Sequence, residues 1–256
     1  MSLEGRVALV TGGSRGVGAA ICEALATDGA DMAVNYRKDR EAADEVVAAV
    51  EALGRRAIAV EGAVGDRAAE RALVDSTLAE FGHIDILVNN AGIASRGQSV
   101  VNTEPDELER VIQVHALGPH RMCGMVVPQM RDRPRGDIVF ISSVATLHHQ
   151  ANGAPYNMGK AAMESLAMTL AKEERPHGIH VNVVAPGLVE TEMGRRLVKA
   201  TQNVEDIHSL DAVSPFGRVC RPEDVANVVR FLVSDHGFYV SGEKVNVWAG
   251  GQEGRY

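Results

Sequence analysis

Residues 6–18 have the sequence RVALVTGGSRGVG, in which a short apolar run leads into a glycine-rich stretch. The run 6–10 predicts a strand and the pattern from Gly16 to Asp28 predicts a helix, so the glycines form the turn between them. Glycines let a backbone approach a pyrophosphate closely, and a helix N-terminus offers free N–H groups and the positive end of its dipole. The spacing Gly-x3-Gly-x-Gly does not satisfy the G-x-G-x-x-G fingerprint, so a tight turn without a ligand stays open as the alternative.

Short apolar runs alternate with helical patterns along the rest of the chain. The predicted strands are 6–10, 31–36, 57–61, 84–89, 137–142, 180–185 and 244–247. The predicted helices are 16–28, 39–53, 66–81, a longer one that opens at Thr103-Glu-Pro-Asp106 with a capping-box-like pattern, 155–175 and 222–234. Strands that are apolar throughout are buried on both faces. The pattern therefore predicts an α/β fold, a doubly wound Rossmann-type parallel sheet of about seven strands with helices on both faces.

No Pro/Ser-rich linker and no internal repeat interrupts this alternation, so we expect a single domain over residues 1–256. Ligands of doubly wound sheets bind at the carboxyl ends of the strands, which directs attention to the loops after each strand. The segment from Leu188 to Pro215 has no regular pattern, and we expect it to be irregular and to set substrate specificity.

Composition and charge exclude several classes of protein. The chain is 45% hydrophobic and 23% charged, which excludes a disordered chain, and its formal net charge of −8 argues against nucleic acid or an anionic membrane as partner. Three widely spaced cysteines, Cys22, Cys123 and Cys220, indicate reduced thiols and a cytoplasmic location. Residues 1–5 lack the pattern of a signal peptide, and the weakly charged segment 111–130 contains two prolines and Arg121, so we predict no membrane span.

The end of the second predicted strand indicates which dinucleotide is bound. An acidic residue about 20 positions after the glycine-rich turn would hold the ribose 2′-OH of NAD, but this strand ends Asn35-Tyr36-Arg37-Lys38. A basic pair suits a 2′-phosphate, and Arg15 in the glycine-rich turn supplies a second guanidinium. The alternative is a solvated charge pair. The missing acid and the two arginines favour NADP(H).

Three further residues have the pattern of an acid–base site. Tyr156 and Lys160 lie four positions apart at the start of a predicted helix, so they share a face. A free phenol has a pKa of about 10, and an ammonium one turn away, with the positive charge of an oxidised nicotinamide, would lower it. Ser143, after the predicted strand 137–142, can hydrogen-bond a substrate carbonyl and hold it against the tyrosine.

With these motifs the sequence resembles the short-chain dehydrogenase/reductase family over nearly its whole length. The matching motifs are TGGSRGVG at 11–18, NNAG at 89–92, ISS at 141–143, YNMGK at 156–160 and NVVAPGLVET at 182–191. The tail is most similar to the 3-oxoacyl-acyl-carrier-protein reductases, through PFGR at 215–218, RPEDVA at 221–226 and AGG at 249–251. The resemblance implies NAD(P)-dependent carbonyl reduction or alcohol oxidation, usually in a homotetramer.

The resemblance also implies roles for individual residues. Ser143 would position the carbonyl oxygen, Tyr156 would protonate it, and Lys160 would bind the ribose hydroxyls and lower the tyrosine pKa. Asn89 and Ala91 would line the adenosine ribose, and 186–191 would hold the carboxamide side of the nicotinamide. Together with the loop pattern, the predicted cofactor-binding residues are Gly12, Ser14, Arg15, Gly16, Val17, Gly18, Asn35, Arg37, Ala63, Val64, Asn89, Ala91, Gly92, Tyr156, Lys160, Pro186, Gly187, Val189 and Thr191.

The sequence departs from the family at three positions. Ala63 stands where the family usually has an Asp that accepts from the adenine amino group, and Gly159 stands where Ser is usual. His115 replaces the Asn of the catalytic tetrad, and it is either a core-facing histidine or a fourth catalytic residue in a proton relay. Pro119 cannot donate to the carbonyl of His115, so we predict a kinked helix that frees this carbonyl for a relay water.

Few charges occur on two predicted helices: only Arg121 between 111 and 130, and only Glu164 between 161 and 171. Helices that are apolar on most sides are buried on most sides. One face packs on the sheet, so the other predicts a two-fold-symmetric homo-oligomer, which by resemblance is a homotetramer.

Other polar residues are weaker candidates. His148 and His149 lie between the predicted Ser and Tyr and could shape a substrate pocket, but no Cys or carboxylate cluster completes a site, so we predict no metal. Arg131, Arg133 and Arg135 could dock an acidic carrier protein or form a solvated loop.

The leading hypothesis is NADPH-dependent reduction of a small-molecule or acyl-thioester carbonyl. An alcohol or sugar dehydrogenase and a non-catalytic dinucleotide-binding regulator stay open as alternatives. His177, where carrier-protein reductases have an arginine, weakens the assignment of the substrate but not that of the reaction.

Overall fold

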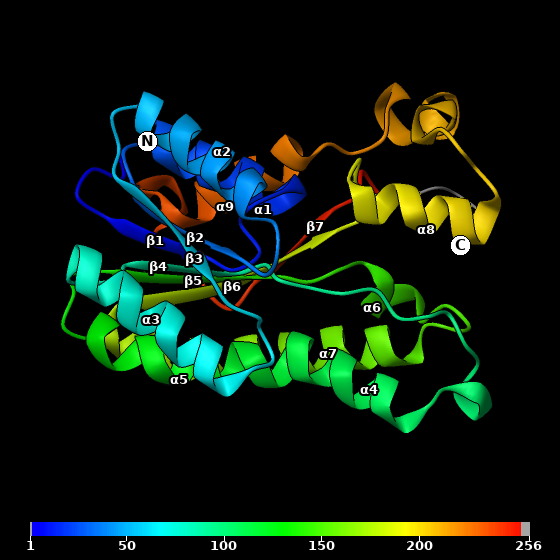
Figure 1. Ribbon diagram of the computed structural model, residues 1–256, viewed down its shortest axis with the longest axis horizontal. Helices are drawn as coiled ribbons and strands as arrows, with labels where there is room; N and C mark the ends of the chain where they lie inside the picture. Colours follow the sequence, from blue (N-terminus) through cyan, green and yellow to red (C-terminus); the bar gives the residue numbers. More distant parts are fainter. Residues whose placement is uncertain (1, 252–256) are drawn as a thin grey trace.

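The computed structural model describes residues 2–251 and shows one sheet between two layers of helices (Figure 1). Within these residues the sheet has seven strands, all parallel, in the order β3-β2-β1-β4-β5-β6-β7. The strands are β1 Val7–Val10, β2 Asp31–Tyr36, β3 Ala57–Glu61, β4 Ile86–Asn89, β5 Gly136–Ile141, β6 Ile179–Pro186 and β7 Lys244–Val247. The strand order reverses between β1 and β4, which is where a doubly wound sheet binds its ligand. The predicted fold class is therefore confirmed.

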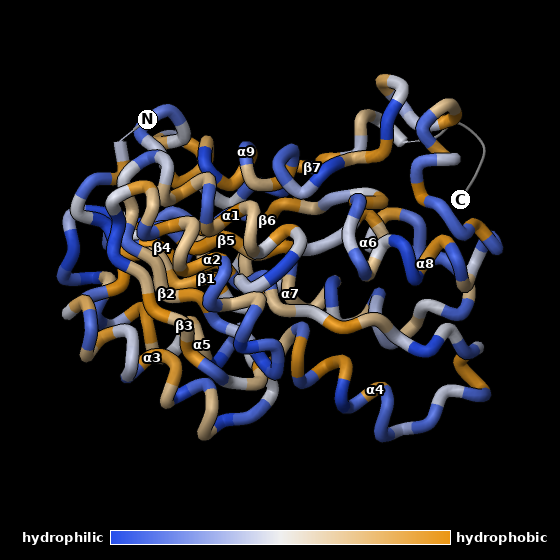
Figure 2. Tube along the Cα trace, turned by 45° about the horizontal axis from the view of Figure 1, so that its top comes forward, coloured by the Kyte–Doolittle hydropathy of each residue, from blue (hydrophilic) through white to orange (hydrophobic). Residues whose placement is uncertain are grey.

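The helices cover both faces of the sheet. They are α1 Gly16–Thr27, α2 Arg40–Ala52, α3 Arg67–Phe81, α4 Pro105–Ile112, α5 Gly118–Met130, α6 Ala145–His148, α7 Ala154–Glu174, α8 Glu192–Gln202 and α9 Pro222–Val233. In Figure 1, α1, α2 and α9 lie on one side and α3, α5 and α7 on the other. Alternate residues of β1 enter the two cores, Ala8 and Val10 on one face and Val7 and Leu9 on the other. Figure 2 shows the strands as the most hydrophobic part of the chain.

The helix predicted to open at Thr103 differs from the expectation in its cap. The N-cap of α4 is Glu104, which makes no capping side-chain bond. The Thr103 hydroxyl instead donates to the carbonyl of Ser99 at 2.9 Å. The capping-box prediction is wrong because Thr103 serves the preceding 3-10 turn, and Pro105 begins the helix without it.

The long helix is interrupted where a kink was predicted. A π-helical turn, Gln113–Leu117, separates α4 from α5, and the N–H of Gly118 donates to the carbonyl of Gln113. Pro119 has no N–H for the carbonyl of His115, so an uninterrupted α-helix would lack a bond at this point. The side chain of His115 therefore projects from an irregular turn.

The segment 188–215 is not irregular, contrary to our expectation. It contains α8, whose N-cap Thr191 accepts a hydrogen bond from the N–H of Gly194 at 3.1 Å, and α8 ends at Asn203 in the left-handed conformation. A small hydrophobic cluster holds the segment together, separate from the two main cores; its buried members are Val198, Ile207 and Val219. The helix was missed because Val198 is the one large apolar side chain that α8 buries.

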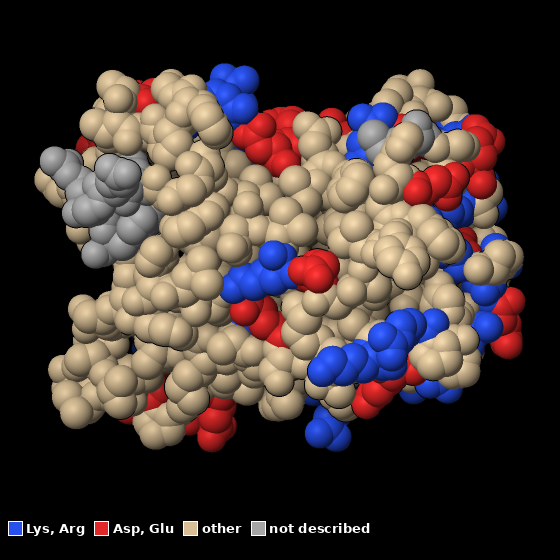
Figure 3. All heavy atoms as spheres, turned by 180° about the vertical axis from the view of Figure 1, so that it is seen from behind, with Lys and Arg blue, Asp and Glu red and all other residues tan. Residues whose placement is uncertain are grey.

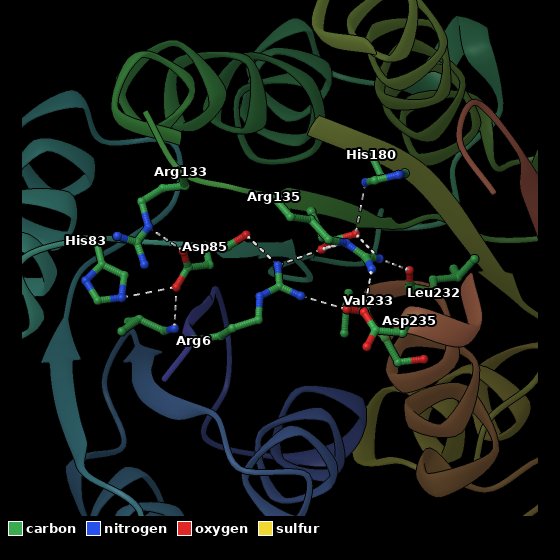
Figure 4. A network of polar contacts seen from close by, with 12 residues as sticks. Arg6, His83, Asp85, Arg133, Arg135, His180, Leu232, Val233 and Asp235 are labelled. Atoms are coloured by element: carbon green, nitrogen blue, oxygen red, sulfur yellow. Dashed lines mark hydrogen bonds and ion pairs between the residues drawn. The ribbon is translucent and has the colours of Figure 1, made fainter. Parts of the chain in front are cut away.

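Two buried carboxylates organise the amino-terminal edge of the sheet, remote from the ligand-binding edge (Figure 4). Asp85 accepts from Arg133 at 2.8 Å, and Asp137 accepts from Arg6 at 2.6 Å and from Arg135 at 2.9 Å. Both carboxylates are at most 2% exposed.

The basic patch before β5 therefore has internal partners. Arg131 likewise pairs with Glu174, at 2.6 Å. Each of the three arginines that could dock a carrier protein pairs with a carboxylate of this chain, which neither alternative included.

Candidate active site

The glycine-rich turn is supported from below by β2. The Oδ1 atom of Asn35 accepts from the N–H of Gly12 at 3.0 Å, and its Nδ2 atom donates to the carbonyl of Gly62 at 2.9 Å. Asn35 is buried, so its amide holds the turn in place from the side of the sheet. The first turn of α1 has no side-chain cap on its N-terminus, because Arg15 at the N-cap makes none. Its N–H groups are therefore available to an anion.

Gly18 allows this turn to fold back on itself. A Cβ atom at this position would lie 2.2 Å from the carbonyl oxygen of Gly12 and 2.7 Å from Nδ2 of Asn90. Asn90 in turn donates to the carbonyls of Thr11 and Gly12 at 2.9 and 3.0 Å. Asn90 was missing from the predicted site residues, although it stands inside the NNAG motif.

The loops after β1 and β4 meet at the switch point. The N–H of Ala91 donates to Oγ1 of Thr11 at 3.0 Å, and a Cβ atom at Gly12 would lie 3.1 Å from the Cα atom of Ala91. Asn89 is buried, with Nδ2 at 3.7 Å from Sγ of Cys123. The loop after β3, with Ala63 and Val64, is half-buried.

The loop after β6 closes the other side of the crevice. A Cβ atom at Gly16 would lie 3.1 Å from Cγ2 of Thr191, so the phosphate-loop candidate and the segment 186–191 come together. Val189 is buried. A Cβ atom at Gly187 would lie 3.1 Å from the Cβ atom of Trp248. Apart from Tyr156 and Lys160 on α7, the predicted cofactor residues thus come from the carboxyl ends of five strands along one edge.

Basic residues gather where a ribose 2′-substituent would lie. Arg37 and Lys38 follow β2 and are exposed. Arg15 forms an ion pair with Asp39, which is also the N-cap of α2 and accepts from the N–H of Ala42 at 3.1 Å. An acid is therefore present near this position, but it is engaged by Arg15 and by the helix.

Ser143, Tyr156 and Lys160 are brought together by the structure. The Ser143 side chain lies close enough to the Tyr156 hydroxyl to lower the pKa of the phenol, and its Oγ atom accepts from the N–H of Ala145 at 3.1 Å. The Nζ atom of Lys160 lies 5.7 Å from the centre of the Tyr156 ring and donates to the carbonyl of Ile141 at 2.7 Å. The end of β5, the loop after it and helix α7 therefore come together at the phenol.

The electrostatics of these groups differ from the expectation in one respect. Burial raises the pKa of Tyr156, and the hydrogen bond from Ser143 opposes this. Burial lowers the pKa of Lys160 to about 7, against the attraction of Glu164. The net effect is a raised phenol pKa, so the lowering expected from the neighbouring amine is not borne out.

A buried polar cluster lies behind Ser143. Ser142 donates to Oε1 of Glu164 at 2.5 Å, and Lys244 donates to Oε2 of Glu164 at 3.0 Å and to the hydroxyl of Thr146 at 2.6 Å. The cluster ties β7 and α7 to the loop that carries Ser143. Sequence reasoning missed it, although Glu164 is the one charge in a long apolar stretch of helix.

His115 lies against the catalytic group and is fully buried. Its ring is edge-on to Tyr156 with 5.2 Å between the ring centres, and its Nε2 atom lies 2.8 Å from the carbonyl oxygen of Ile93. Burial, helped by the charge of Lys160, lowers the pKa of His115 to about 3. The structure confirms that His115 faces the core, and a role in a proton relay stays a prediction.

The other candidates add no metal site. Within residues 2–251, no group of three or more His, Cys, Asp or Glu side chains could hold a metal ion. His148 packs against Trp248, with 5.2 Å between the ring centres. In the same residues, no helix has the length and apolar character needed to span a bilayer.

Known proteins resemble this chain along almost its whole length. Residues 6–202 match the family model described as short chain dehydrogenase. Versicolorin reductase 1 of Aspergillus parasiticus is 38% identical over 97% of this chain and 97% of that protein. The 3-oxoacyl-[acyl-carrier-protein] reductase of Synechocystis sp. is 37% identical over 97% of this chain and 98% of that protein. A crystal structure of a short chain dehydrogenase from Burkholderia cenocepacia J2315 in complex with NADP is 36% identical, with a TM-score of 0.87 over 97% of this chain and 98% of that one.

Proposed function

The chain belongs to the short-chain dehydrogenase family of oxidoreductases, and we propose that it reduces a ketone or 3-oxoacyl thioester to an alcohol with NADPH. The observation that carries this proposal is the contact of Ser143 with Tyr156 beside the buried amine of Lys160. The two relatives described above are named reductases, which supports the reductive direction.

The glycine-rich turn fits the pyrophosphate of a dinucleotide. The uncapped N-terminus of α1 presents N–H groups, and Gly18 leaves open the turn that any side chain would fill. We assign Arg15 and Arg37 to the 2′-phosphate of NADPH, because two guanidiniums can bind it with charge-assisted hydrogen bonds. Asn35 holds the turn for this purpose.

In this reaction, different residues of the chain transfer the proton and position the substrate. When bound, NADPH supplies the hydride that reduces the carbonyl carbon. Ser143 and Tyr156 both hydrogen-bond the carbonyl oxygen, which takes the place of their contact with each other, and Tyr156 donates its proton to that oxygen. Lys160, held by the carbonyl of Ile141, keeps its remaining N–H groups for the ribose hydroxyls and stabilises the phenolate that is left.

The substrate we infer is a freely diffusing carbonyl compound rather than one presented by a carrier protein. The arginines before β5 are occupied by carboxylates, so they offer an acidic carrier little free charge. Large apolar side chains are exposed on and after α8, namely Met193, Leu197, Val213 and Phe216. They favour a substrate with an apolar body.

We further infer a homotetramer in the cytoplasm. Figure 3 shows a face on which much of the surface is uncharged. The charges Arg121 and Glu164 of the two apolar helices are engaged internally, by Glu70 at 2.5 Å and by Lys244 at 2.9 Å. The exposed positions of α7 nearby are small: Ala161, Ala162, Ser165 and Thr169. Surfaces of this kind support close packing of one subunit on another.

Oxidation of NADPH with a panel of carbonyl substrates tests the proposed reaction. The panel contains β-ketoesters, polycyclic ketones and a 3-oxoacyl thioester, with polyols and NADP⁺ for the oxidative direction. We expect turnover with at least one carbonyl and its loss in Tyr156→Phe. Tight NADPH binding without turnover of any substrate would favour the non-catalytic regulator instead, and faster turnover of polyols would favour a sugar dehydrogenase.

A further inference from the structure

His115 and Gly159 share one space between the π-helical turn and α7. A Cβ atom at position 159 would lie 2.9 Å from the Cβ atom of His115 and 3.4 Å from its Cγ atom. Contacts this short to the Cβ and Cγ atoms of His115 cannot be relieved by rotating its ring. Glycine inside a helix costs about 1 kcal/mol relative to alanine. The space that the imidazole of His115 occupies explains why α7 has a glycine at position 159 in spite of this cost.

Gly92 bounds the same ring on its other side. A Cβ atom at Gly92 would lie 2.9 Å from Cε1 of His115. The imidazole is therefore enclosed between two glycines, and the contact of 2.8 Å from Nε2 to the carbonyl oxygen of Ile93 fixes its orientation. The Nε2 atom also lies 3.3 Å from the N–H of Ile93, but its shorter contact is to the carbonyl oxygen, which only accepts; this favours a hydrogen on Nε2 and a lone pair on Nδ1 in the neutral ring.

The Nδ1 atom and the amine of Lys160 both lie near Gly92. A Cβ atom built on Gly92 would lie 3.6 Å from Nδ1 of His115 and 3.7 Å from Nζ of Lys160. Both nitrogens therefore border one small space. Among residues 2–251 no group hydrogen-bonds Nδ1, although it is buried. Of the three donors of Lys160, the described residues engage one, through Ile141. A buried acceptor and spare ammonium donors thus border the same space.

We propose that His115 is a positioning residue for Lys160, because its Nδ1 atom accepts a hydrogen bond from a water molecule that Lys160 binds. Gly159 has no side chain and so leaves the space that the imidazole ring occupies. The proposal rests on the proposed function and deepens it by adding a side chain to the proton path. No proton needs to reside on His115, which stays neutral. Besides His115, the charged or titratable groups that act on this space are Tyr156, Lys160 and Glu164 on α7 and Arg110 on α4.

The proposal predicts in which direction the pH dependence of kcat should shift when His115 is replaced. A neutral acceptor favours the charged form of Lys160, so its removal lowers the pKa of the amine. In His115→Leu, which is apolar and keeps much of the volume, the alkaline limb of the kcat profile should move down by about one pH unit. In His115→Asn, which keeps an acceptor, the limb should stay closer to that of the parent enzyme.

The pairing of His115 with Gly159 is tested by a double-mutant cycle. Gly159→Ser alone should displace the ring and lower kcat at least about tenfold, which corresponds to about 1.4 kcal/mol in the barrier. The same substitution in a His115→Asn background should cost much less, because the smaller side chain leaves room. Equal losses in the two backgrounds would overturn the pairing, and an unshifted pH profile in His115→Leu would overturn the positioning role.

A measurement on the unmutated protein keeps the proposal testable if a variant fails to fold. Nitrogen NMR of the histidine rings, with and without NADPH, should show for His115 a protonated Nε2 and an unprotonated Nδ1. The opposite tautomer would overturn the proposal. This result does not depend on turnover, so a lack of activity with every carbonyl would refute the proposed function without deciding the ring geometry.

Discussion

Arg15 and Asp39 form an ion pair at the mouth of the glycine-rich turn, where a guanidinium is expected to meet the 2′-phosphate of the cofactor. Both side chains are well exposed, 59% and 45%, so the pair is weak and a phosphate can displace the carboxylate. The carboxylate nevertheless lowers the positive potential that a phosphate meets there. Asp39 is therefore placed to moderate the choice between NADPH and NADH.

Substitutions at this pair and at Arg37 test the cofactor preference. We expect NADPH to bind more tightly than NADH by about 1–3 kcal/mol, the range for charge-assisted hydrogen bonds. Arg37→Ala should reduce this difference, whereas Asp39→Asn, which can still cap α2, should increase it. Titration of both cofactors by fluorescence measures it. Arg40→Ala is the matched control, since Arg40 pairs with Asp44 on α2; equal affinities in the parent protein would contradict the assignment.

In the proposed relay, Pro119 and His115 have different roles. Pro119→Ala restores an N–H that can bond the carbonyl of residue 115 and draw the π-helical turn toward a regular helix. We expect it to lower kcat more than His115→Asn, which keeps the distorted backbone. Steady-state kinetics of the two variants with the same carbonyl compare them directly. A dead His115→Asn beside a fully active Pro119→Ala would make the imidazole itself the relay.

His115 should make the protein sensitive to acid. Its pKa falls from 6.5 to about 3 on folding, so the unfolded chain binds a proton between these values that the folded chain does not. Stability therefore rises with pH across this window and is lost as the pH falls below about 6.5. Between pH 6.5 and 4.5 the loss from this group is about 2–3 kcal/mol. Urea unfolding of His115→Leu at the two pH values should show a correspondingly smaller loss; an equal loss would contradict the assignment.

Asp137 should matter for stability and not for cofactor binding. Its replacement by Ala leaves Arg6 and Arg135 without their buried carboxylate, which costs about 3–5 kcal/mol. Asp235→Ala is the control, because Asp235 is 93% exposed and only 3.5 Å from the same Arg135; its cost should stay within about 0.5 kcal/mol. Urea unfolding gives both values. A weaker NADPH affinity in Asp137→Ala at a temperature where it is folded would link the two edges of the sheet.

The state of assembly follows from the uncharged surfaces of α5 and α7. Light scattering at micromolar concentration should give a homotetramer or, at least, a two-fold-symmetric dimer. Ala161→Arg places a charge at an exposed position of α7 and should weaken the assembly. A monomeric parent protein would refute the proposal.

Local pattern predicted most elements because continuous apolar strands and glycine turns are decided within a few residues. The strands β2, β3 and β7 were predicted with their observed bounds. Helix α8 was missed although its apolar side chains recur at helical spacing, because it is short and mostly polar and buries only one large apolar side chain, Val198.

Pairings between distant residues were the part that the sequence left hidden. Arg131 and Arg133 are visible as part of a basic patch, but their carboxylates, Glu174 and Asp85, lie far away in the sequence and meet them only in the folded protein. In the same way, His115 and Gly159 are two separate departures from the family pattern, and only the packing of α7 on the π-helical turn makes them one.

The cluster of Val198, Ile207 and Val219 gives residues 188–219 a core of their own. Such a segment can open and close at a lower free energy than the sheet, and amide exchange should be faster in α8 than in α5. The segment can also be exchanged as a unit. A homologous stretch with its own small core can replace it without changing the packing of the two main cores. Under the proposed function, the selectivity for the substrate can therefore change while the residues of the nucleotide half stay the same.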